Sequence, residues 1–488
     1  MHHCKVVHPS QYKARKFEDL AQGLRQICAC LLLAAFFGCA AGMRHPLVPG
    51  PLQGDGELYV EMRPFAQTLR GLRVEVESAA AVALDGSSVP LVVRRASLSG
   101  ADFPGERRLA WGRVKPGAYA GVELRFRTAS RATAAATRDL TIPTPAVRVD
   151  APVSIAQGRA TVVALELRGA VSDGAFTPEL TSSTPAKALP AVSGFASSSA
   201  LHDLTVFDKR ARIVSDVLPT GRAPWGIAID ALSNRVYVAL SGQDEVEAFD
   251  LQSGASLARV RLSIGDAPRD LALTPDRRLL VTANSGSNSI SFIDPTSMIE
   301  VSRATGGEEP TWILVDRRGT RAYVSNARSN TVTVLDLATR AVVTTLSTDD
   351  RALRAQIDRA GSRLYLAIPA SAWLTVLSLP DLSLQNRVYV GLGVSGLKVD
   401  PATDLVYVSH RDERWLAVFD PLSFMPLDHV EMPGSATYMV IDDAQNALFA
   451  LLPDSASIAI VDLNMRRTAA VLDVGEQPPV IALVGERN

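Results

Sequence analysis

Residues 321–336 read RAYVSNARSNTVTVLD, and this stretch decides the fold of the larger part of the chain. It holds two short runs in which apolar and smaller or polar residues alternate, separated by the polar segment ARSN. A period of two residues is typical of a β-strand with one buried face. A polar turn between two such runs predicts a hairpin.

The pattern recurs every 42 residues, with a single interval of 44. An apolar pair and a polar residue end one strand of each unit at Asp208, Asp250, Asp294, Asp336, Ser378, Asp420 and Asp462. A second strand is marked by Phe195, Tyr237, Val281, Tyr323, Tyr365, Tyr407 and Phe449. A third ends at Asp230, Thr274, Asp316, Asp358, Asp400, Asp442 and Val484. We expect these aspartates to accept hydrogen bonds from turn amides two residues on, which is a structural role.

Each unit holds four short strands, and four-stranded units of about 40 to 45 residues are the signature of β-propeller blades. Six units are complete, starting near Pro219, Ile264, Gly307, Thr348, Gly391 and Pro433. Residues 195–218 hold the last three strands of a seventh unit, and residues 479–485 hold a lone first strand. The sequence therefore predicts an all-β protein with a seven-bladed propeller over residues 191–488. We expect its N-terminal and C-terminal strands to pair, which leaves no open edge on the ring.

The repeat resembles the YVTN-type propeller family. The residues that carry the resemblance are Tyr323-Val324-Ser325-Asn326 and Val332-Thr333-Val334-Leu335-Asp336. Units four and six depart from the family pattern, with Ile368-Pro369 and Leu452-Pro453 where the family has a small residue and Asn. The resemblance implies the fold. It does not select a function, because similar rings include surface proteins, lactonases and electron-transfer enzymes.

The first half of the chain predicts a separate β domain at residues 57–180, followed by a polar linker at 181–190. Leu72, Val74 and Val76 alternate with charged residues, as in half-buried strands of an antiparallel sheet. A β-sandwich of about six to eight strands is the expected result. The order of motifs, from FPGERRL at 103–109 to KPGAYAGVEL at 115–124, resembles the DUF4382 family of bacterial extracytoplasmic domains. That resemblance implies location more than chemistry.

Residues 1–39 predict an export signal, and residues 40–56 a tether. Basic residues precede an apolar run of eleven residues at 27–37, which is shorter than the ~20 that a membrane-spanning helix needs. Small residues around Cys39 resemble a lipobox, so we expect acylation at Cys39, with Phe36 where lipoboxes prefer Leu. Cleavage near residues 40–42 with simple secretion is one alternative, and an uncleaved segment is another. The true start of translation stays open. The predicted location is the bacterial envelope, at the outer membrane or in the periplasm.

Composition excludes several classes of partner and cofactor. With 50 basic and 51 acidic residues, no net field favours nucleic acid. All four cysteines, Cys4, Cys28, Cys30 and Cys39, lie in the leader, so we expect no disulfide and no thiolate site in the mature chain. Only His45, His202, His410 and His429 follow the leader, so we expect no metal site and no cofactor. We expect His410 to be an ordinary surface or turn residue, and His429 to lie on a strand face.

The candidate site is the ring of first strands, because these strands line the central channel of a propeller. Aligning the units places six distinctive residues at equivalent positions: Trp225, Arg269, Asp270, Trp312, Arg354 and Tyr438. Arginine with aromatic neighbours can bind an anionic or ring-shaped ligand. The alternative is that these residues only cap the channel. We expect Asp270 to be held ionised beside Arg269, which suits an anchor better than a general base.

We therefore predict an exported, lipid-anchored envelope protein whose propeller binds a protein or a small anionic ligand. The alternative is a lactonase-like hydrolase at the channel mouth. A His, Glu and Arg constellation would favour the enzyme, and the aligned positions hold only the arginines. A purely structural envelope role is a third possibility that the sequence does not separate from binding.

Overall fold

The computed structural model describes residues 50–102, 104–133 and 136–487, which form 38 strands and three short 3-10 helices. The 3-10 helices are η1 (Gln67–Leu69), η2 (Pro190–Val192) and η3 (Pro453–Ser455). The strands form one ten-stranded sheet and seven four-stranded sheets. The prediction of an all-β chain is confirmed. The predicted signal peptide and Cys39 lie outside the described residues.

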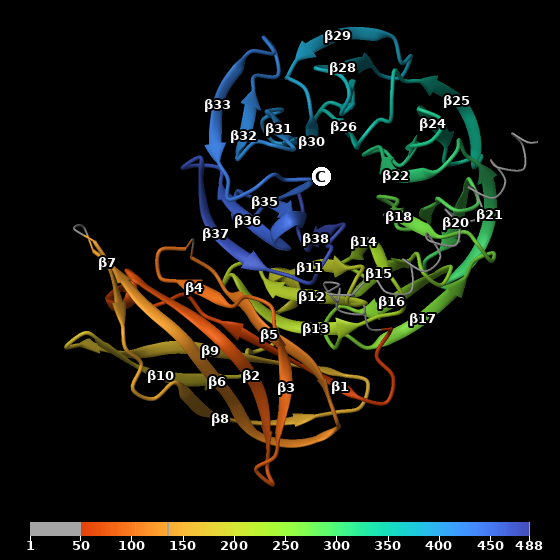
Figure 1. Cartoon of the computed structure of the whole chain (residues 1–488). Helices are drawn as coiled ribbons and strands as arrows, with labels where there is room; N and C mark the ends of the chain where they lie inside the picture. The colour runs from red at the N-terminus through yellow and green to blue at the C-terminus, as the bar shows by residue number, and fades with distance from the viewer. Residues whose placement is uncertain (1–49, 103, 134–135, 488) are drawn as a thin grey trace, which may run out of the picture. The chain divides into compact units, whose positions relative to one another are not determined.

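Seven four-stranded blades form a closed ring (Figure 1). The first blade contains β14 (Pro224–Asp230), β15 (Arg235–Leu240), β16 (Glu245–Asp250) and β17 (Ser256–Arg261). The second contains β18 (Pro268–Leu273), β19 (Leu280–Asn284), β20 (Ser289–Asp294) and β21 (Ile299–Thr305). The third contains β22 (Pro310–Val315), β23 (Arg321–Asn326), β24 (Thr331–Asp336) and β25 (Ala341–Ser347).

The fourth blade contains β26 (Ala355–Ile357), β27 (Arg363–Leu366), β28 (Trp373–Ser378) and β29 (Leu384–Tyr389). The fifth contains β30 (Val394–Val399), β31 (Val406–His410), β32 (Trp415–Phe419) and β33 (Pro426–Glu431). The sixth contains β34 (Tyr438–Asp442), β35 (Ala447–Leu452), β36 (Ser457–Asp462) and β37 (Arg467–Asp473). In each of these six blades the four strands pair in chain order, so the first strand is innermost and the last is outermost.

The repeat residues do what their pattern predicts. The aromatic series lies on the second strand of each blade and is buried, as at Tyr237, Tyr323 and Phe449, so it packs blade against blade. The aspartates that end strands accept turn amides. Asp230 accepts the N–H groups of Leu232 and Ser233 at 3.1 Å each. Burial of the aromatic rings supplies packing energy, and the carboxylates fix the turns.

The seventh blade is built from both ends of the propeller, as predicted. We call it the closing blade; it contains β11 (Ser193–Ser198), β12 (Asp203–Asp208), β13 (Ile213–Pro219) and β38 (Ile481–Leu483). β38 pairs antiparallel with β11, and Phe195 faces Ala482 in the register. Because this blade contains strands from both ends of the propeller, its strand pairing closes the ring.

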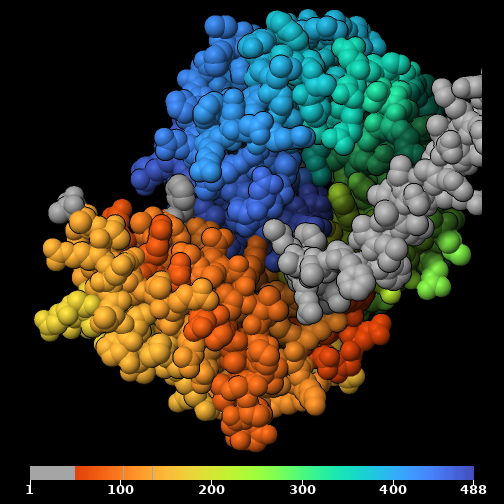
Figure 2. Space-filling view, in the orientation of Figure 1, coloured from red at the N-terminus to blue at the C-terminus, as the bar shows by residue number. Residues whose placement is uncertain are grey.

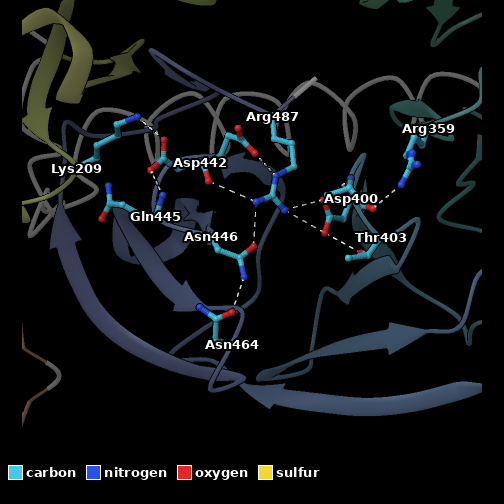
Figure 3. A network of polar contacts seen from close by, with 11 residues as sticks. Lys209, Arg359, Asp400, Thr403, Asp442, Gln445, Asn446, Asn464 and Arg487 are labelled. Atoms are coloured by element: carbon cyan, nitrogen blue, oxygen red, sulfur yellow. Dashed lines mark hydrogen bonds and ion pairs between the residues drawn. The ribbon is translucent and has the colours of Figure 1, made fainter.

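Charged side chains surround this closure (Figure 3). The buried Lys209 ammonium pairs with Asp442 and donates to the carbonyl of Val484, just beyond β38. The Arg487 guanidinium bonds to Asp443 Oδ1 at 2.8 Å and to Asp400 Oδ1 at 3.1 Å. The C-terminal segment is therefore held by ion pairs as well as by strand pairing.

The N-terminal sheet has ten strands, more than the expected six to eight. They are β1 (Gly56–Met62), β2 (Leu72–Ala83), β3 (Ser88–Val93), β4 (Ser97–Ser99), β5 (Arg107–Val114), β6 (Gly117–Ala132), β7 (Thr137–Leu140), β8 (Ala146–Ile155), β9 (Ala160–Ser172) and β10 (Ala175–Ser183). β3 pairs with both β2 and β5, so one continuous sheet folds over a single apolar core. The strand of the predicted alternation, β2, pairs antiparallel with β6, as expected. β1, in contrast, pairs parallel with β9.

The ten-stranded sheet and the propeller belong to one compact unit that starts at Pro49. Backbone bonds join them: the N–H of Val471 donates to Pro104 at 2.7 Å, and that of Asp473 donates to Glu106 at 3.1 Å. Tyr59 and Val162 of the sheet share an apolar cluster with propeller residues. Figure 2 shows the two parts in continuous surface contact. The outer edge strand β37 is thus covered, as exposed strand edges require.

In the stretches of chain that the structure describes, no helix combines the length and the hydropathy that crossing a membrane requires.

Candidate functional site

A cavity of about 650 Å³ lies inside the ring of first strands. Residues from all seven innermost strands line it, together with turn residues that follow them, such as Pro275 and Pro401, and with the C-terminal residues Glu486 and Arg487. In Figure 1 the C-terminus lies at the centre of the ring. The innermost strands therefore create a shared chamber to which each blade contributes its own side chains.

Four of the six predicted residues line this cavity: Asp270, Trp312, Arg354 and Tyr438. They occupy equivalent positions of the repeat, in four different blades, and the ring symmetry brings equivalent positions to one level of the channel. The fifth blade has Gly396 at this level. A Cβ at this position would lie 2.7 Å from Ser409 Oγ and 3.1 Å from the carbonyl oxygen of Ala436, so glycine avoids a clash there.

Arg354 is the central cation of this level. Its guanidinium carbon lies 3.6 Å from the ring centroid of Tyr438 and 6.0 Å from that of Trp312. Within the described ranges, no ion pair joins Arg354 to a carboxylate, and its charge rests on aromatic faces. Burial raises the pKa of Tyr438 to about 12, so its hydroxyl stays protonated at neutral pH.

Asp270 has a different environment from the one we expected. Burial raises the pKa of its carboxyl, and the nearby Arg354 charge opposes that rise. The N–H of Ile313 donates to its Oδ2 at 3.1 Å. The cation that acts on Asp270 is therefore Arg354, from another blade, and the prediction that Arg269 holds it ionised was wrong. Neighbours along a strand point to opposite sides, which separates residues 269 and 270.

Trp225 and Arg269 form a separate pair one position earlier on the first strands. The Arg269 guanidinium carbon lies 4.5 Å from the ring centroid of Trp225. Neither residue is among those that line the 650 Å³ cavity. The structure thus divides the six predicted residues into a cavity group of four and a stacked pair of two.

The sequence analysis missed the charged residues Lys398 and Glu486, and also Gln356. All three line the cavity. Lys398 is buried on β30, and its Nζ lies 3.0 Å from Glu486 Oε1. The sequence does distinguish Gln356 and Lys398, at the position of the repeat two residues after Arg354 and Gly396. There Gln356 and Lys398 are polar, whereas the other units hold Ala228, Ala272, Leu314, Val440 and Ala482.

The three histidines in the described part of the chain, His202, His410 and His429, are not among the residues that line this cavity. His410 is buried on β31, and its Nε2 lies 2.8 Å from the carbonyl oxygen of Val390, so the expectation of a surface or turn residue was wrong. His202 accepts the N–H of Ala223 at 3.0 Å, and His429 lies on β33. His45 lies outside the described residues. Among residues 50–102, 104–133 and 136–487, no three His, Cys, Asp or Glu side chains are grouped to hold a metal ion.

Fold and cavity define an all-β protein with a seven-bladed propeller and a polar chamber on its axis. Residues 192–403 match the model of a family described as YNCE-like beta-propeller. This match agrees with the propeller that the repeat predicted, and it leaves the DUF4382 resemblance and the lipoprotein leader untested. None of the curated proteins compared with the chain matches it.

Solved structures share the fold at low sequence identity. A hydrazine synthase structure from Kuenenia stuttgartiensis is 16% identical, has a TM-score of 0.50, and matches over 57% of this chain and 94% of its own. A functionally unknown protein from Desulfotomaculum acetoxidans is 14% identical, has a TM-score of 0.53, and matches over 60% of this chain and 98% of its own. These likenesses show the fold alone.

A Bacteroides uniformis structure, described provisionally as a 6-phosphogluconolactonase, is 14% identical and has a TM-score of 0.49. It matches over 60% of this chain and 99% of its own. This likeness is too weak to carry an argument about activity. Because 1662 chains of solved structures match this one, similarity of fold does not select a function.

Proposed function

We propose that the propeller is a binding module that takes a small organic anion into its central cavity. The observation that carries this proposal is Arg354, a cation in the cavity that rests on the Tyr438 ring and has no ion-pair partner in the described part of the chain. A ligand carboxylate can supply the missing partner through two parallel hydrogen bonds from the guanidinium. Trp312 and Tyr438 offer ring faces beside it.

Ion pairs hold three of the five cations in the cavity lining, and in the described part of the chain they leave Arg317 and Arg354 without a carboxylate partner. Five cationic side chains line it: Arg277, Arg317, Arg354, Lys398 and Arg487. Four carboxylates face them: Asp230, Asp270, Asp316 and Glu486. Arg487 forms ion pairs with Asp400 and Asp443, and Lys398 forms one with Glu486. Arg277 lies 3.9 Å from Asp230, so Arg317 and Arg354 remain beside Asp270 and Asp316. Burial raises the pKa of the Asp270 carboxyl.

The test uses phthalate, a dianion on an aromatic ring, titrated calorimetrically into the wild-type protein and Arg354→Ala. Losing one charge-assisted contact costs about 1.5 to 3 kcal/mol, so we expect at least about tenfold weaker binding by Arg354→Ala. Arg363→Ala is the matched control, because Arg363 also lies over a ring, 5.8 Å from the centroid of Phe424, and is absent from the cavity lining. Equal affinity in all three proteins would place the site elsewhere, on an outer blade face or the N-terminal sheet.

The proposal includes export and lipid anchoring at Cys39 in the bacterial envelope. It rests on the basic residues, the eleven-residue apolar run and the small residues around Cys39.

A further inference from the structure

We infer that Glu486 acts as an internal competitor, whose carboxylate occupies the place that a carboxylate of the ligand takes on Lys398. The inference rests on the proposed function and adds a regulation of the same cavity. Its consequence is that the ligand contacts two cations, Arg354 and Lys398, and must displace the chain's own carboxylate to reach the second. The ligand class is therefore an organic anion with at least two carboxylates.

Lys398 is buried at the cavity wall. Its side chain is 8% exposed, and its Nζ lies 3.0 Å from Glu486 Oε1. A buried ammonium requires a partner, because desolvation without one is costly. Lys398 therefore keeps an anion beside it in every state of the protein. In the absence of a ligand that anion is Glu486.

The side chains of Lys398 and Glu486 differ in their access to solvent. The Glu486 side chain is 21% exposed, so it has a route to solvent that Lys398 lacks. Glu486 follows Gly485, whose φ of +76° is accessible to glycine at little cost. Exchange of one carboxylate for another on Lys398 thus requires only that the Glu486 side chain rotate outwards.

The backbone around Glu486 is fixed. The N–H of Arg487 donates to Ile441 at 2.8 Å, and the Arg487 side chain bonds to Asp443, Asp400 and Asn446 (Figure 3). Because these bonds hold the segment on the fifth and sixth blades, Glu486 stays close to the cavity after it rotates. It therefore returns when the ligand leaves, and the competition is reversible.

Glu486 lines the same cavity as Arg354 and Tyr438. The charges of both Glu486 and Arg354 act on the hydroxyl of Tyr438, so all three groups lie in one neighbourhood of the cavity. A ligand with one carboxylate on Arg354 can therefore place another near Lys398. The chain's own carboxylate shows which chemical group the second position accepts.

The experiment uses acetate as a probe of the vacated position. Glu486→Ala leaves Lys398 without its partner, so we expect acetate to raise the melting temperature of this variant in a saturable way. At matched ionic strength, the wild-type protein should require at least about tenfold more acetate for the same effect, because Glu486 competes there. Acetamide, which is uncharged, should have no effect, and the double variant Lys398→Met/Glu486→Ala should not respond to acetate.

A response of Glu486→Ala to acetate that does not exceed that of the wild type would overturn the inference. If Glu486→Ala does not fold, Glu486→Gln replaces it, and we expect this variant to bind phthalate at least about tenfold more tightly than wild type. Unchanged phthalate affinity in Glu486→Gln would also overturn it. Failure of the proposed function looks different, because phthalate would then bind wild type and Arg354→Ala equally, whatever Glu486 does.

Discussion

At the scale of single residues, the fold buries charged side chains that depend on one another. Lys209 is 2% exposed and its partner Asp442 is fully buried. Removing one member of a buried ion pair leaves the other uncompensated. Lys209 also donates to the carbonyl of Val484, the residue after β38. Through Asp442 and Val484 it therefore connects the sixth blade to the C-terminal strand of the closing blade.

Replacing this lysine by an apolar residue of similar length should therefore be costly. We expect Lys209→Met to lower the free energy of unfolding by about 3 to 5 kcal/mol, because Asp442 loses its counter-charge. Lys187→Met is the matched control: Lys187 is 59% exposed and lies 3.3 Å from Asp216. An exposed pair contributes about 0 to 1 kcal/mol. Urea unfolding measures both, and equal losses in the two variants would contradict this account.

The sequence predicted the turn aspartates and missed the buried lysine, and the reason is physical. An aspartate that accepts its own turn amides acts within three residues, so its role is visible locally. Lys209 follows Asp208 in a polar turn and looks exposed. Its partners are Asp442 and Val484, more than 200 residues away, and only the closed ring brings them together. Lys398 and Glu486 are 88 residues apart, and they too are brought together only when the ring closes.

At the scale of elements, the closing blade depends on β38, a strand of three residues from the far end of the chain. Its residues are all buried and pair with β11. Without β38, the inner edge of β11 has no partner. Unpaired strand edges in apolar surroundings promote association between molecules.

Deleting residues 479–488 should therefore lower stability and promote association. The reason is the loss of five buried apolar side chains, at residues 480–484, and of the innermost strand of the closing blade. We expect thermal unfolding at a clearly lower temperature, with aggregates visible by light scattering. Arg487→Ala, which keeps β38 and removes the ion pairs to Asp400 and Asp443 and the hydrogen bond to Asn446, should show a smaller loss. An unchanged melting temperature in the deletion would mean that the ring closes in another way.

Elements were predictable where they repeat. The 42-residue interval located the blades. It also predicted that the two ends of the propeller pair, because residues 195–218 lack the first strand of a blade and residues 479–485 supply one. The N-terminal sheet has no repeat, so its strand count and its parallel pair of β1 with β9 could not be derived. Parallel pairing joins segments about 100 residues apart, and no local pattern encodes that choice.

At the scale of the whole molecule, the contact between the ten-stranded sheet and the propeller buries several acidic groups. Burial raises the pKa of both Glu106 and Asp203 to about 7. The Tyr59 hydroxyl donates to Asp203 Oδ2 at 2.9 Å, and the Val214 N–H donates to Glu106 Oε2 at 2.9 Å. Arg108 pairs with the buried Glu61 at 2.8 Å in the same region.

These acidic groups make stability depend on pH. The pKa of each carboxyl is higher in the folded than in the unfolded state, so the folded protein binds more protons between about pH 4 and pH 7. Stability is therefore lost as the pH rises through about 7. We expect a higher free energy of unfolding at pH 5.5 than at pH 8. Glu106→Gln should flatten this dependence in urea titrations, and higher stability at pH 8 would contradict it.

The proposed lipid anchor makes a prediction about the whole protein in the cell. We expect the wild-type protein to fractionate with membranes and Cys39→Ser to be released or misprocessed, because the acyl chains would attach at that thiol. Mass spectrometry of the mature N-terminus gives the direct readout. Soluble wild-type protein that begins at residue 40 or later would show simple secretion instead.

The central claim is that the cavity on the propeller axis binds an organic anion through Arg354. The most direct measurement is a crystal structure of the wild-type protein with phthalate. The account predicts phthalate inside the ring, with one carboxylate on the Arg354 guanidinium beside Trp312 and Tyr438. Phthalate bound only on an outer blade face or on the N-terminal sheet, with Arg354 still resting on Tyr438 and no anion beside it, would contradict the claim.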